Sequence, residues 1–317
     1  MIDVDFLIVG AGAAGMSAAL YGARLGLDTR VLDETGAGGQ AVLIDSLENY
    51  PGIFPGVNGA ELSETMRRQA ESFGAKFTSA SVISIDKKDG FFYAKTAGDE
   101  FRAHAVLIAT GAEHKMLGVE GETEFYGRGV SYCAVCDGPF FRGKTVAVIG
   151  GGDSACTEAL FLAKLASRVI LIHRRAEFRA QKIYVDRIRA AENIEILTNT
   201  VVKKIIGGDA QKNGGAVNGI LTANVISGAE QTLAADGIFI FAGMKPRTKL
   251  LDILKKDSGG SIVTDDSMAT DIPGLFCAGD VRSKPLRQIV TACADGATAA
   301  FSAEKYIDGI KHGKTHE

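Results

Sequence analysis

Two cysteines, Cys133 and Cys136, are separated by two residues and lie just ahead of a glycine-rich segment. A pair with this spacing can cycle between dithiol and disulfide where its surroundings stabilise a thiolate. The glycine-rich segment, 150–155, has a counterpart at 10–15, and each follows a short apolar run typical of a strand. A glycine turn between a strand and a helix lets backbone N–H groups receive a pyrophosphate. The sequence therefore predicts two dinucleotide sites and one redox-active dithiol.

The residue that ends the second strand of each predicted unit is expected to contact the nucleotide ribose. In the first unit this residue is Asp33, whose carboxylate accepts from ribose hydroxyls and repels a 2′-phosphate, as suits FAD or NAD. In the second unit the same offset from the glycines leads to His173, followed by Arg174 and Arg175. These arginines, helped by Arg179, can pair with the 2′-phosphate of NADPH through charge-assisted hydrogen bonds. A basic run is otherwise a solvated loop, but the shared register favours phosphate binding.

A cysteine pair has two other common explanations. It can be half of a zinc site, but tetrahedral zinc needs four ligands and the other three cysteines show no second pair. It can also be an inert pair of packed thiols, but Asp137 and the Gly138-Pro139 that follows indicate a turn at which a thiolate is stabilised. We expect core positions for Cys156, Cys277 and Cys293. We assign no chemistry to His104, His114, His312 and His316.

The composition indicates a two-domain α/β enzyme. Of its 317 residues, 46% are hydrophobic and 39 are glycine, enough to fill large cores and supply many tight turns. A net charge of −3 does not favour binding to nucleic acid or to an anionic membrane. No apolar run approaches the ~20 residues of a transmembrane helix. The N-terminal residues show no pattern typical of a signal peptide. The five cysteines contain one close pair and do not form the pattern of a secreted disulfide framework, so we expect a cytoplasmic protein.

The order of the elements predicts that the first domain is interrupted by the second. The strand–helix–strand units are expected at 6–33 and 144–173, with further helices at 59–73, 181–191 and 288–308, and strands at 76–95, 105–111 and 237–243. Only the first domain lacks a closing strand and helix, so the C-terminal segment is assigned back to it. We predict a first domain of residues 1–114 and 245–317 and an inserted domain of residues 115–244, with crossovers near 112–118 and 243–247.

The motifs together resemble those of the low-molecular-weight thioredoxin reductases. The matching segments span the chain: Gly10-x-Gly-x-x-Gly15, Gly38-Gly-Gln40, Glu48-Asn-Tyr-Pro-Gly52, Ala109-Thr-Gly111, Cys133-Ala-Val-Cys-Asp137, Gly150-Gly-Gly-Asp-Ser-Ala155, His173-Arg-Arg175, Gly279-Asp280 and Arg287-Gln288. The dithiol between the two nucleotide units distinguishes this group from the high-molecular-weight disulfide reductases. The resemblance implies two Rossmann-like dinucleotide-binding domains of the class II pyridine nucleotide-disulfide oxidoreductase type, with the NADPH domain inserted in the FAD domain.

The resemblance also implies a homodimer in which electrons pass from NADPH to FAD, then to the dithiol and on to thioredoxin. The nicotinamide and the disulfide must reach one flavin, so we expect the inserted domain to rotate between half-reactions at the two glycine-containing crossovers. By analogy Cys136 faces the flavin, Cys133 attacks the thioredoxin disulfide, and Asp137 is the general acid. Phe140 and Phe141 are either core or part of the docking surface for thioredoxin.

The cofactor contacts follow from the motifs and the resemblance. For FAD we predict Gly10, Gly12, Ala13, Ala14, Gly15, Asp33, Glu34, Gly39, Gln40, Asn49, Val82, Gly111, Gly279, Asp280, Arg287, Gln288 and Ile289. For NADPH we predict Gly150, Gly152, Asp153, Ser154, Ala155, His173, Arg174, Arg175 and Arg179. No metal ligand is predicted.

The sequence leaves three alternatives to a thioredoxin reductase open. A related flavoprotein can reduce another thioredoxin-like partner, although the alkyl hydroperoxide reductase form carries an additional N-terminal dithiol domain that this sequence does not show. A ferredoxin-dependent reductase of the same fold is expected to lack the basic segment 173–175. A flavin-binding redox sensor would use the dithiol as a switch rather than as a relay. Bleaching of bound flavin by NADPH, followed by turnover with thioredoxin, separates these.

Overall fold

The computed structural model of the chain describes residues 1–208, 215–251 and 253–313. It divides into two compact units: Met1–Glu113 with Lys245–Glu317 form unit 1, and His114–Met244 form unit 2. Both units are built on parallel strands, so the predicted α/β class with two Rossmann-like domains is confirmed. His316 lies outside the described residues.

Unit 1 is organised around one mixed sheet with the strand order β3-β2-β1-β6-β5-β4. Strands β1, β2, β3 and β6 run parallel, whereas β4 and β5 form an antiparallel extension. One edge of β6 pairs with β5 along its first half and with the closing strand β17 along its last three residues. The strands are β1 (Ile2–Val9), β2 (Thr29–Asp33), β3 (Lys76–Ser79), β4 (Ser84–Lys88), β5 (Phe91–Lys95), β6 (Glu100–Ile108) and β17 (Leu275–Cys277).

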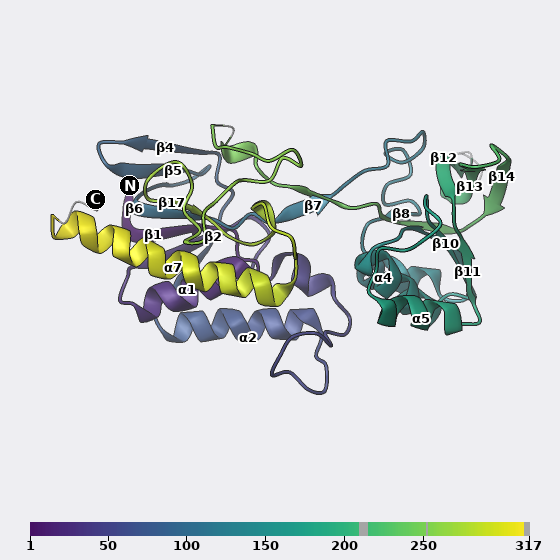
Figure 1. The fold of residues 1–317 in the computed structure, drawn as a ribbon, viewed down its shortest axis with the longest axis horizontal. Coiled ribbons are helices and arrows are strands. Elements are labelled where there is room, and N and C mark those ends of the chain that lie inside the picture. The colour runs from purple at the N-terminus through teal and green to yellow at the C-terminus, as the bar shows by residue number, and fades with distance from the viewer. Residues whose placement is uncertain (209–214, 252, 314–317) are drawn as a thin grey trace. The chain divides into compact units, whose positions relative to one another are not determined.

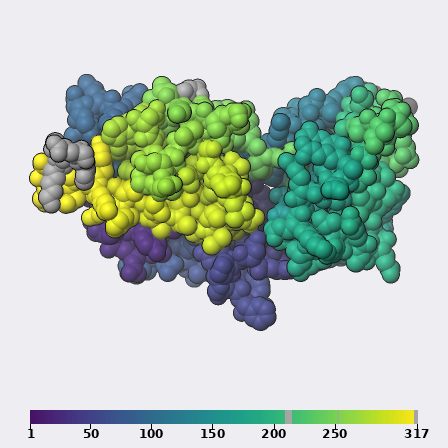
Figure 2. Space-filling model, in the orientation of Figure 1, coloured from purple at the N-terminus to yellow at the C-terminus, as the bar shows by residue number. Residues whose placement is uncertain are grey.

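Three helices cover one face of this sheet, with α1 between α2 and α7 (Figure 1). They are α1 (Ala13–Arg24), α2 (Gly59–Ser72) and α7 (Ile289–Lys311), accompanied by the short 3-10 turns η1 (Gly39–Leu43), η3 (Lys249–Leu251) and η4 (Gly279–Val281). Asn58 caps α2 by accepting a hydrogen bond from the Glu61 N–H at 2.8 Å. Figure 2 shows the surface of the C-terminal segment, from light green to yellow, running along one side of unit 1.

The alternation of side chains along β1 creates two cores in unit 1. Phe6 and Ile8 pack toward the small residues of α1 and α7, while Leu7 and Val9 pack on the opposite face with β5, β17 and η3. Because both faces are covered, the strand is apolar at every one of these positions, as a central parallel strand requires.

Unit 2 contains a five-stranded parallel sheet with the order β11-β10-β9-β15-β8. Helices α4 and α5 cover one face, and the antiparallel sheet β12-β13-β14 packs on the other. The strands are β8 (Val130–Ser131), β9 (Thr145–Gly150), β10 (Arg168–Ile172), β11 (Ile194–Leu197), β12 (Thr200–Gly207), β13 (Val217–Asn224), β14 (Glu230–Ala234) and β15 (Gly237–Phe241). The helices are α3 (Ala134–Asp137), α4 (Asp153–Ala163) and α5 (Lys182–Ala190), with the 3-10 turn η2 (Gly138–Phe141).

The two crossover segments pair with each other. Strand β7 (Ala112–His114) and strand β16 (Met244–Pro246) form a two-stranded sheet. Gly111, just before β7, has a φ of +66°, a conformation that favours glycine. None of the helices in the described part of the chain is both long and apolar enough to span a bilayer.

Candidate active site

The three glycines of the turn in unit 1, Gly10, Gly12 and Gly15, have different structural roles. A Cβ on Gly10 would lie 2.3 Å from the Ala109 carbonyl oxygen, and a Cβ on Gly15 would lie 1.8 Å from the Gly10 carbonyl oxygen. These two glycines therefore let strand, turn and helix approach one another. A Cβ on Gly12 would meet no atom within 4 Å, so the backbone at the start of α1 faces open space. This is the arrangement that lets helix N–H groups receive a pyrophosphate.

Asp33 fixes this turn through its carboxylate. Its Oδ2 accepts a hydrogen bond from the Ala11 N–H at 2.8 Å, and its Oδ1 accepts from the Thr35 N–H at 2.8 Å. The next segment returns to the same place, because the Gly38 N–H donates to the Ala11 carbonyl at 2.7 Å. A Cβ on Gly39 would lie 3.2 Å from the Gly12 Cα. Gln40 follows Gly39 and is exposed on the surface.

The C-terminal part of the chain completes this site. Gly279, with a φ of +78°, packs so closely on α1 that a Cβ would lie 3.0 Å from the Ala14 Cβ. Asp280 follows it, and burial raises the pKa of its carboxyl above the usual value, although Lys284 and Arg287 oppose that shift. The Asn49 amide donates to the Gln288 side chain at 3.0 Å at the start of α7. Predicted FAD residues far apart in sequence thus gather around the first turns of α1 and α7.

Five other predicted FAD residues have identified partners or positions. The Val82 side chain is buried in the core and can offer only its backbone. Glu34 accepts from Ser81 Oγ at 3.1 Å and pairs with Arg247 at 3.5 Å. Arg287 donates to Ser261 Oγ at 3.2 Å. The Gly111 carbonyl accepts from the Arg247 N–H at 3.0 Å. Ile289 is the first residue of α7.

The glycine turn of unit 2 repeats this geometry. A Cβ on Gly150 would lie 2.5 Å from the Phe241 carbonyl oxygen, whereas a Cβ on Gly152 would meet nothing within 4 Å. Ala155 takes the place of the third glycine and is fully buried. Asp153 opens α4 and accepts two hydrogen bonds from Gln181, from its N–H at 2.8 Å and from its side-chain amide at 2.7 Å. Ser154 is exposed beside it.

His173 and its neighbours separate into a buried part and an exposed part. The His173 ring is buried, stacks on Phe178 with centroids 5.2 Å apart, and lies where a Cβ on Gly151 would come within 2.2 Å of it. Its Nε2 lies 3.0 Å from the Glu177 carbonyl oxygen, and burial lowers its pKa. His173 is therefore a support beneath the glycine turn. The side chains of Arg174, Arg175 and Arg179 are exposed to solvent.

The dithiol lies at the edge of the parallel sheet of unit 2. Cys133 and Cys136 form a disulfide with their Cα atoms 5.4 Å apart. Cys133 is the N-cap of α3, and its Sγ accepts from the Cys136 N–H at 3.1 Å. Ser131 Oγ accepts from the Cys133 N–H at 3.0 Å. Backbone N–H groups at a helix start stabilise a thiolate, so the pair suits reversible reduction.

Phe140 and Phe141, next to the dithiol, differ in exposure. Phe141 packs edge-on against Phe239 with centroids 5.4 Å apart, and a Cβ on Gly237 would come within 2.5 Å of its ring. Phe140 is 73% exposed. The partly buried Phe141 therefore packs against the core, and of the two rings Phe140 is the one available to a protein partner.

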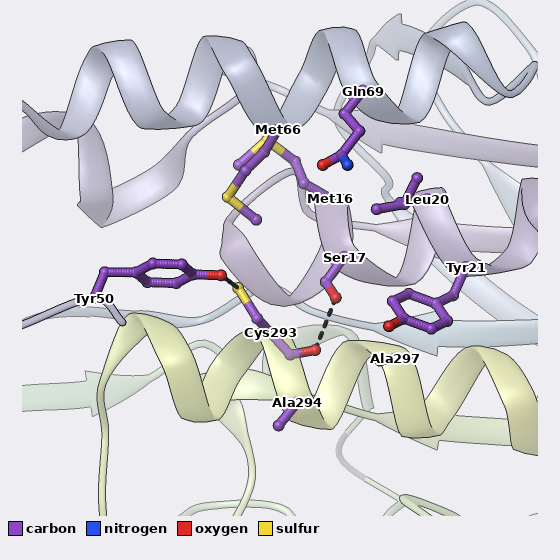
Figure 3. Close-up of a pocket in the computed structure, with 10 residues that line it drawn as sticks. All are labelled: Met16, Ser17, Leu20, Tyr21, Tyr50, Met66, Gln69, Cys293, Ala294 and Ala297. Carbon is purple, nitrogen blue, oxygen red and sulfur yellow. Dashed lines mark hydrogen bonds between the residues drawn. The ribbon is translucent and has the colours of Figure 1, made fainter. Parts of the chain in front are cut away.

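A pocket of about 310 Å³ opens between α1, α2 and α7 in unit 1 (Figure 3). Its lining consists of Met16, Ser17, Leu20, Tyr21, Tyr50, Met66, Gln69, Cys293, Ala294 and Ala297, and includes no residue predicted to bind a cofactor. Tyr50 Oη lies 3.8 Å from Cys293 Sγ. Burial raises the pKa of Tyr50 to about 12 and that of Cys293 above its usual value. Both groups stay protonated near neutral pH, so this pocket offers no thiolate chemistry.

Comparison with known proteins agrees with this geometry. Residues 4–296 match the family described as pyridine nucleotide-disulphide oxidoreductase. The chain belongs to this family. A thioredoxin reductase of Treponema pallidum is 49% identical over 310 residues, which is 98% of this chain and 99% of that protein.

Solved structures in the family show the same fold. A thioredoxin reductase of Lactococcus lactis matches with a TM-score of 0.92 and 41% identity, over 96% of this chain and 99% of that one. A thioredoxin reductase of T. acidophilum matches with a TM-score of 0.91 and 39% identity, over 98% of this chain and 100% of that one. The resemblance to low-molecular-weight thioredoxin reductases is therefore confirmed.

The cofactors of this pyridine nucleotide-disulphide oxidoreductase are FAD and NADPH. The residues present fit both groups. We call the glycine turns around Gly12 and Gly152 the two cradles. Each leaves open space at the N-terminus of a helix, where backbone N–H groups can bind a pyrophosphate. In unit 2, three arginines near the second cradle, Arg174, Arg175 and Arg179, are exposed, which suits the additional phosphate of NADPH.

Two contributors to the site are absent from the sequence predictions. Ser131 Oγ accepts a hydrogen bond from the Cys133 N–H and donates one to the Cys133 carbonyl oxygen. The Gln181 side-chain amide donates to the Asp153 carboxylate at the start of α4. Ser131 lies two residues before a cysteine, and a hydroxyl at that spacing commonly binds nearby backbone. Gln181 carried no comparable signal, because its contact with Asp153 depends on how α5 folds back toward α4.

Proposed function

We propose that this chain is an NADPH-dependent thioredoxin-disulfide reductase that binds FAD in unit 1 and NADPH in unit 2. The observation that carries the proposal is the Cys133–Cys136 disulfide in the same unit as a glycine cradle flanked by exposed arginines. Names of relatives matched over nearly the full chain support it.

The chain's own residues account for binding and for the sulfur chemistry. FAD, when bound, accepts two electrons from the nicotinamide and passes them on to a disulfide. Two electrons and one proton then break the Cys133–Cys136 bond, giving one thiol and one thiolate. One cysteine attacks the thioredoxin disulfide, forming a mixed disulfide and expelling a thiolate. The other cysteine attacks the mixed disulfide, which restores the Cys133–Cys136 bond and releases dithiol thioredoxin.

The division of roles between the two cysteines is part of the proposal. We assign Cys136 to the flavin side, Cys133 to the attack on thioredoxin, and Asp137 to protonation of the leaving thiolate. Cys136 is exposed and Cys133 is half-buried. The proposal also includes a rotation of the inserted unit between half-reactions, because the nicotinamide and the disulfide must reach one flavin.

The partners follow from the same assignment. We propose thioredoxin as the protein substrate, with Phe140 as a docking contact, and a homodimer in the cytoplasm. Tyr21 on α1 and Phe301 on α7, which are 46% and 50% exposed, offer apolar surface for a second copy. Light scattering of the FAD-loaded protein tests the dimer.

Turnover with thioredoxin tests the function directly. The FAD-loaded protein is mixed with NADPH and oxidised thioredoxin, and NADPH consumption is followed together with the appearance of thioredoxin thiols. We expect one dithiol for each NADPH, a much slower reaction with NADH, and none with the Cys136→Ser variant. Consumption of NADPH without thioredoxin thiols would contradict the proposal.

A further inference from the structure

Asp295 is a buried carboxylate on α7 that lies at the centre of an ion cluster. It is 8% exposed, and its Oδ2 accepts from the Gly279 N–H at 3.0 Å and from Lys284 Nζ at 2.6 Å. Its Oδ1 accepts from Arg282 Nη1 at 3.1 Å. The two cationic side chains are also shielded, with 13% of Arg282 and 5% of Lys284 exposed. One carboxylate thus holds a turn and two cations at once.

The turn that Asp295 holds carries a predicted FAD contact. Strand β17 ends at Cys277, and η4 begins two residues later with Gly279, directly before Asp280. The bond from the Gly279 N–H to Asp295 therefore fixes the backbone on which the Asp280 carboxylate stands. Arg282 and Lys284 hold the far end of the same turn to the same carboxylate.

Close packing makes this position sensitive to small displacements. A Cβ on Gly296 would lie 2.1 Å from the Ala14 carbonyl oxygen, and a Cβ on Gly279 would lie 3.0 Å from the Ala14 Cβ. Ala14 lies in the first turn of α1, directly after the open cradle at Gly12. The η4 turn, the second turn of α7 and the start of α1 therefore meet without spare room. The Asp295 carboxylate joins α7 to the η4 turn, and Ser17 Oγ on α1 donates to the Cys293 carbonyl of α7 at 2.8 Å.

We propose that Asp295 is a positioning residue for FAD, which holds the 279–284 turn so that Asp280 stands beside the glycine cradle of α1. It acts through the turn and does not itself contact the cofactor. The inference rests on the proposed binding of FAD to unit 1.

The charge balance of the cluster determines how the test is designed. Asp295→Asn leaves Arg282 and Lys284 buried without their counter-charge, which destabilises a fold strongly. Combining Asp295→Asn with Lys284→Gln removes one anion and one cation, so the net charge of the side chains at 282, 284 and 295 stays the same. The hydrogen bond from the Gly279 N–H to residue 295 is nevertheless weakened. Asp308→Asn is the matched control, because Asp308 is an exposed carboxylate on the same helix that pairs only at the surface with His312.

The experiment measures the FAD dissociation constant and the thermal midpoint with and without FAD. We expect both Asp295 variants to bind FAD at least 10-fold more weakly and to show a smaller rise in midpoint on FAD addition, while Asp308→Asn behaves as the unaltered protein. Binding of NADP⁺ to unit 2 should be unchanged. A purely structural role would lower both midpoints equally and leave the FAD dissociation constant unaltered, which would overturn the inference. If the unaltered chain binds no FAD, the proposed function itself fails.

Discussion

The two glycine turns of this chain have the same backbone arrangement and different strand-end residues. In both, the first glycine touches a neighbouring strand and the middle glycine faces open space. In unit 1 the strand ends in Asp33, which binds the turn through a carboxylate. In unit 2 the strand is followed directly by His173, whose ring fills the space beneath the turn, and then by exposed arginines. We propose that the shared scaffold receives a pyrophosphate in both units and that the residues at the strand end decide which nucleotide is accepted.

The two sites also differ in how they are assembled along the chain. The site in unit 2 is built from residues 130–181, whereas the site in unit 1 joins α1 to η4 and α7 from the other end of the chain. A local site tolerates changes elsewhere, and a site joined over a long separation depends on its closing contacts. Variants in the two units should therefore fail in different ways.

The largest expected effect is confined to unit 2. Cys133→Ser or Cys136→Ser should lower thioredoxin turnover by at least ~1,000-fold, because a covalent relay needs both sulfurs. Reduction of FAD by NADPH precedes the dithiol and should continue. Stopped-flow absorbance measures both steps. A long-wavelength charge-transfer band in Cys136→Ser, and none in Cys133→Ser, would reverse our assignment of the two cysteines.

The next effect separates the two strand ends. Arg174→Ala with Arg175→Ala should reduce the preference for NADPH over NADH, since each lost charge-assisted bond costs about 1.5–3 kcal/mol, roughly 10-fold or more. Steady-state kinetics with both nucleotides measures it. Arg168→Ala is the control, because Arg168 pairs with Glu195 at the other end of β10. An unaltered preference in the double variant would remove these arginines from the phosphate site.

A smaller effect distinguishes the glycines of one turn. Gly12→Ala should leave the stability of the FAD-free protein unchanged and weaken FAD binding roughly 10-fold, or about 1.4 kcal/mol, because its Cβ occupies the cradle. Gly15→Ala should instead destabilise unit 1 by about 1–3 kcal/mol through overpacking against Gly10. Thermal melts and FAD titration separate the two outcomes. Equal loss of stability in both variants would contradict the different roles assigned to Gly12 and Gly15.

The smallest effect concerns the neighbouring aromatic side chains. Phe140→Ala should raise the KM for thioredoxin about 5-fold, roughly 1 kcal/mol, without changing stability, because its ring is exposed. Phe141→Ala should cost about 3 kcal/mol of stability, at the lower end for a phenylalanine truncation, because its partly buried ring packs against the core. Denaturant unfolding and turnover assays measure the pair. An unchanged KM in Phe140→Ala would remove this side chain from the docking surface.

Sequence patterns predicted the elements and the glycine turns well because these are local features. The helix expected at 59–73 is α2 at Gly59–Ser72, and the strand expected at 237–243 is β15 at Gly237–Phe241. Burial was harder to predict, since a ring such as that of His173 or Phe141 can turn inward or outward from the same backbone. Connections such as Asp295 to Gly279 depend on tertiary packing, for which spacing along the chain gives no signal.

The electron capacity of the FAD-loaded protein tests the central claim that one chain joins both nucleotides to one dithiol. Under anaerobic conditions NADPH is added stepwise while flavin absorbance and free thiols are measured. The account predicts that full reduction takes two equivalents of NADPH, one for FAD and one for the Cys133–Cys136 disulfide, and that Cys133→Ser takes one. Full reduction of the unaltered protein by a single equivalent, with no new thiols, would contradict it.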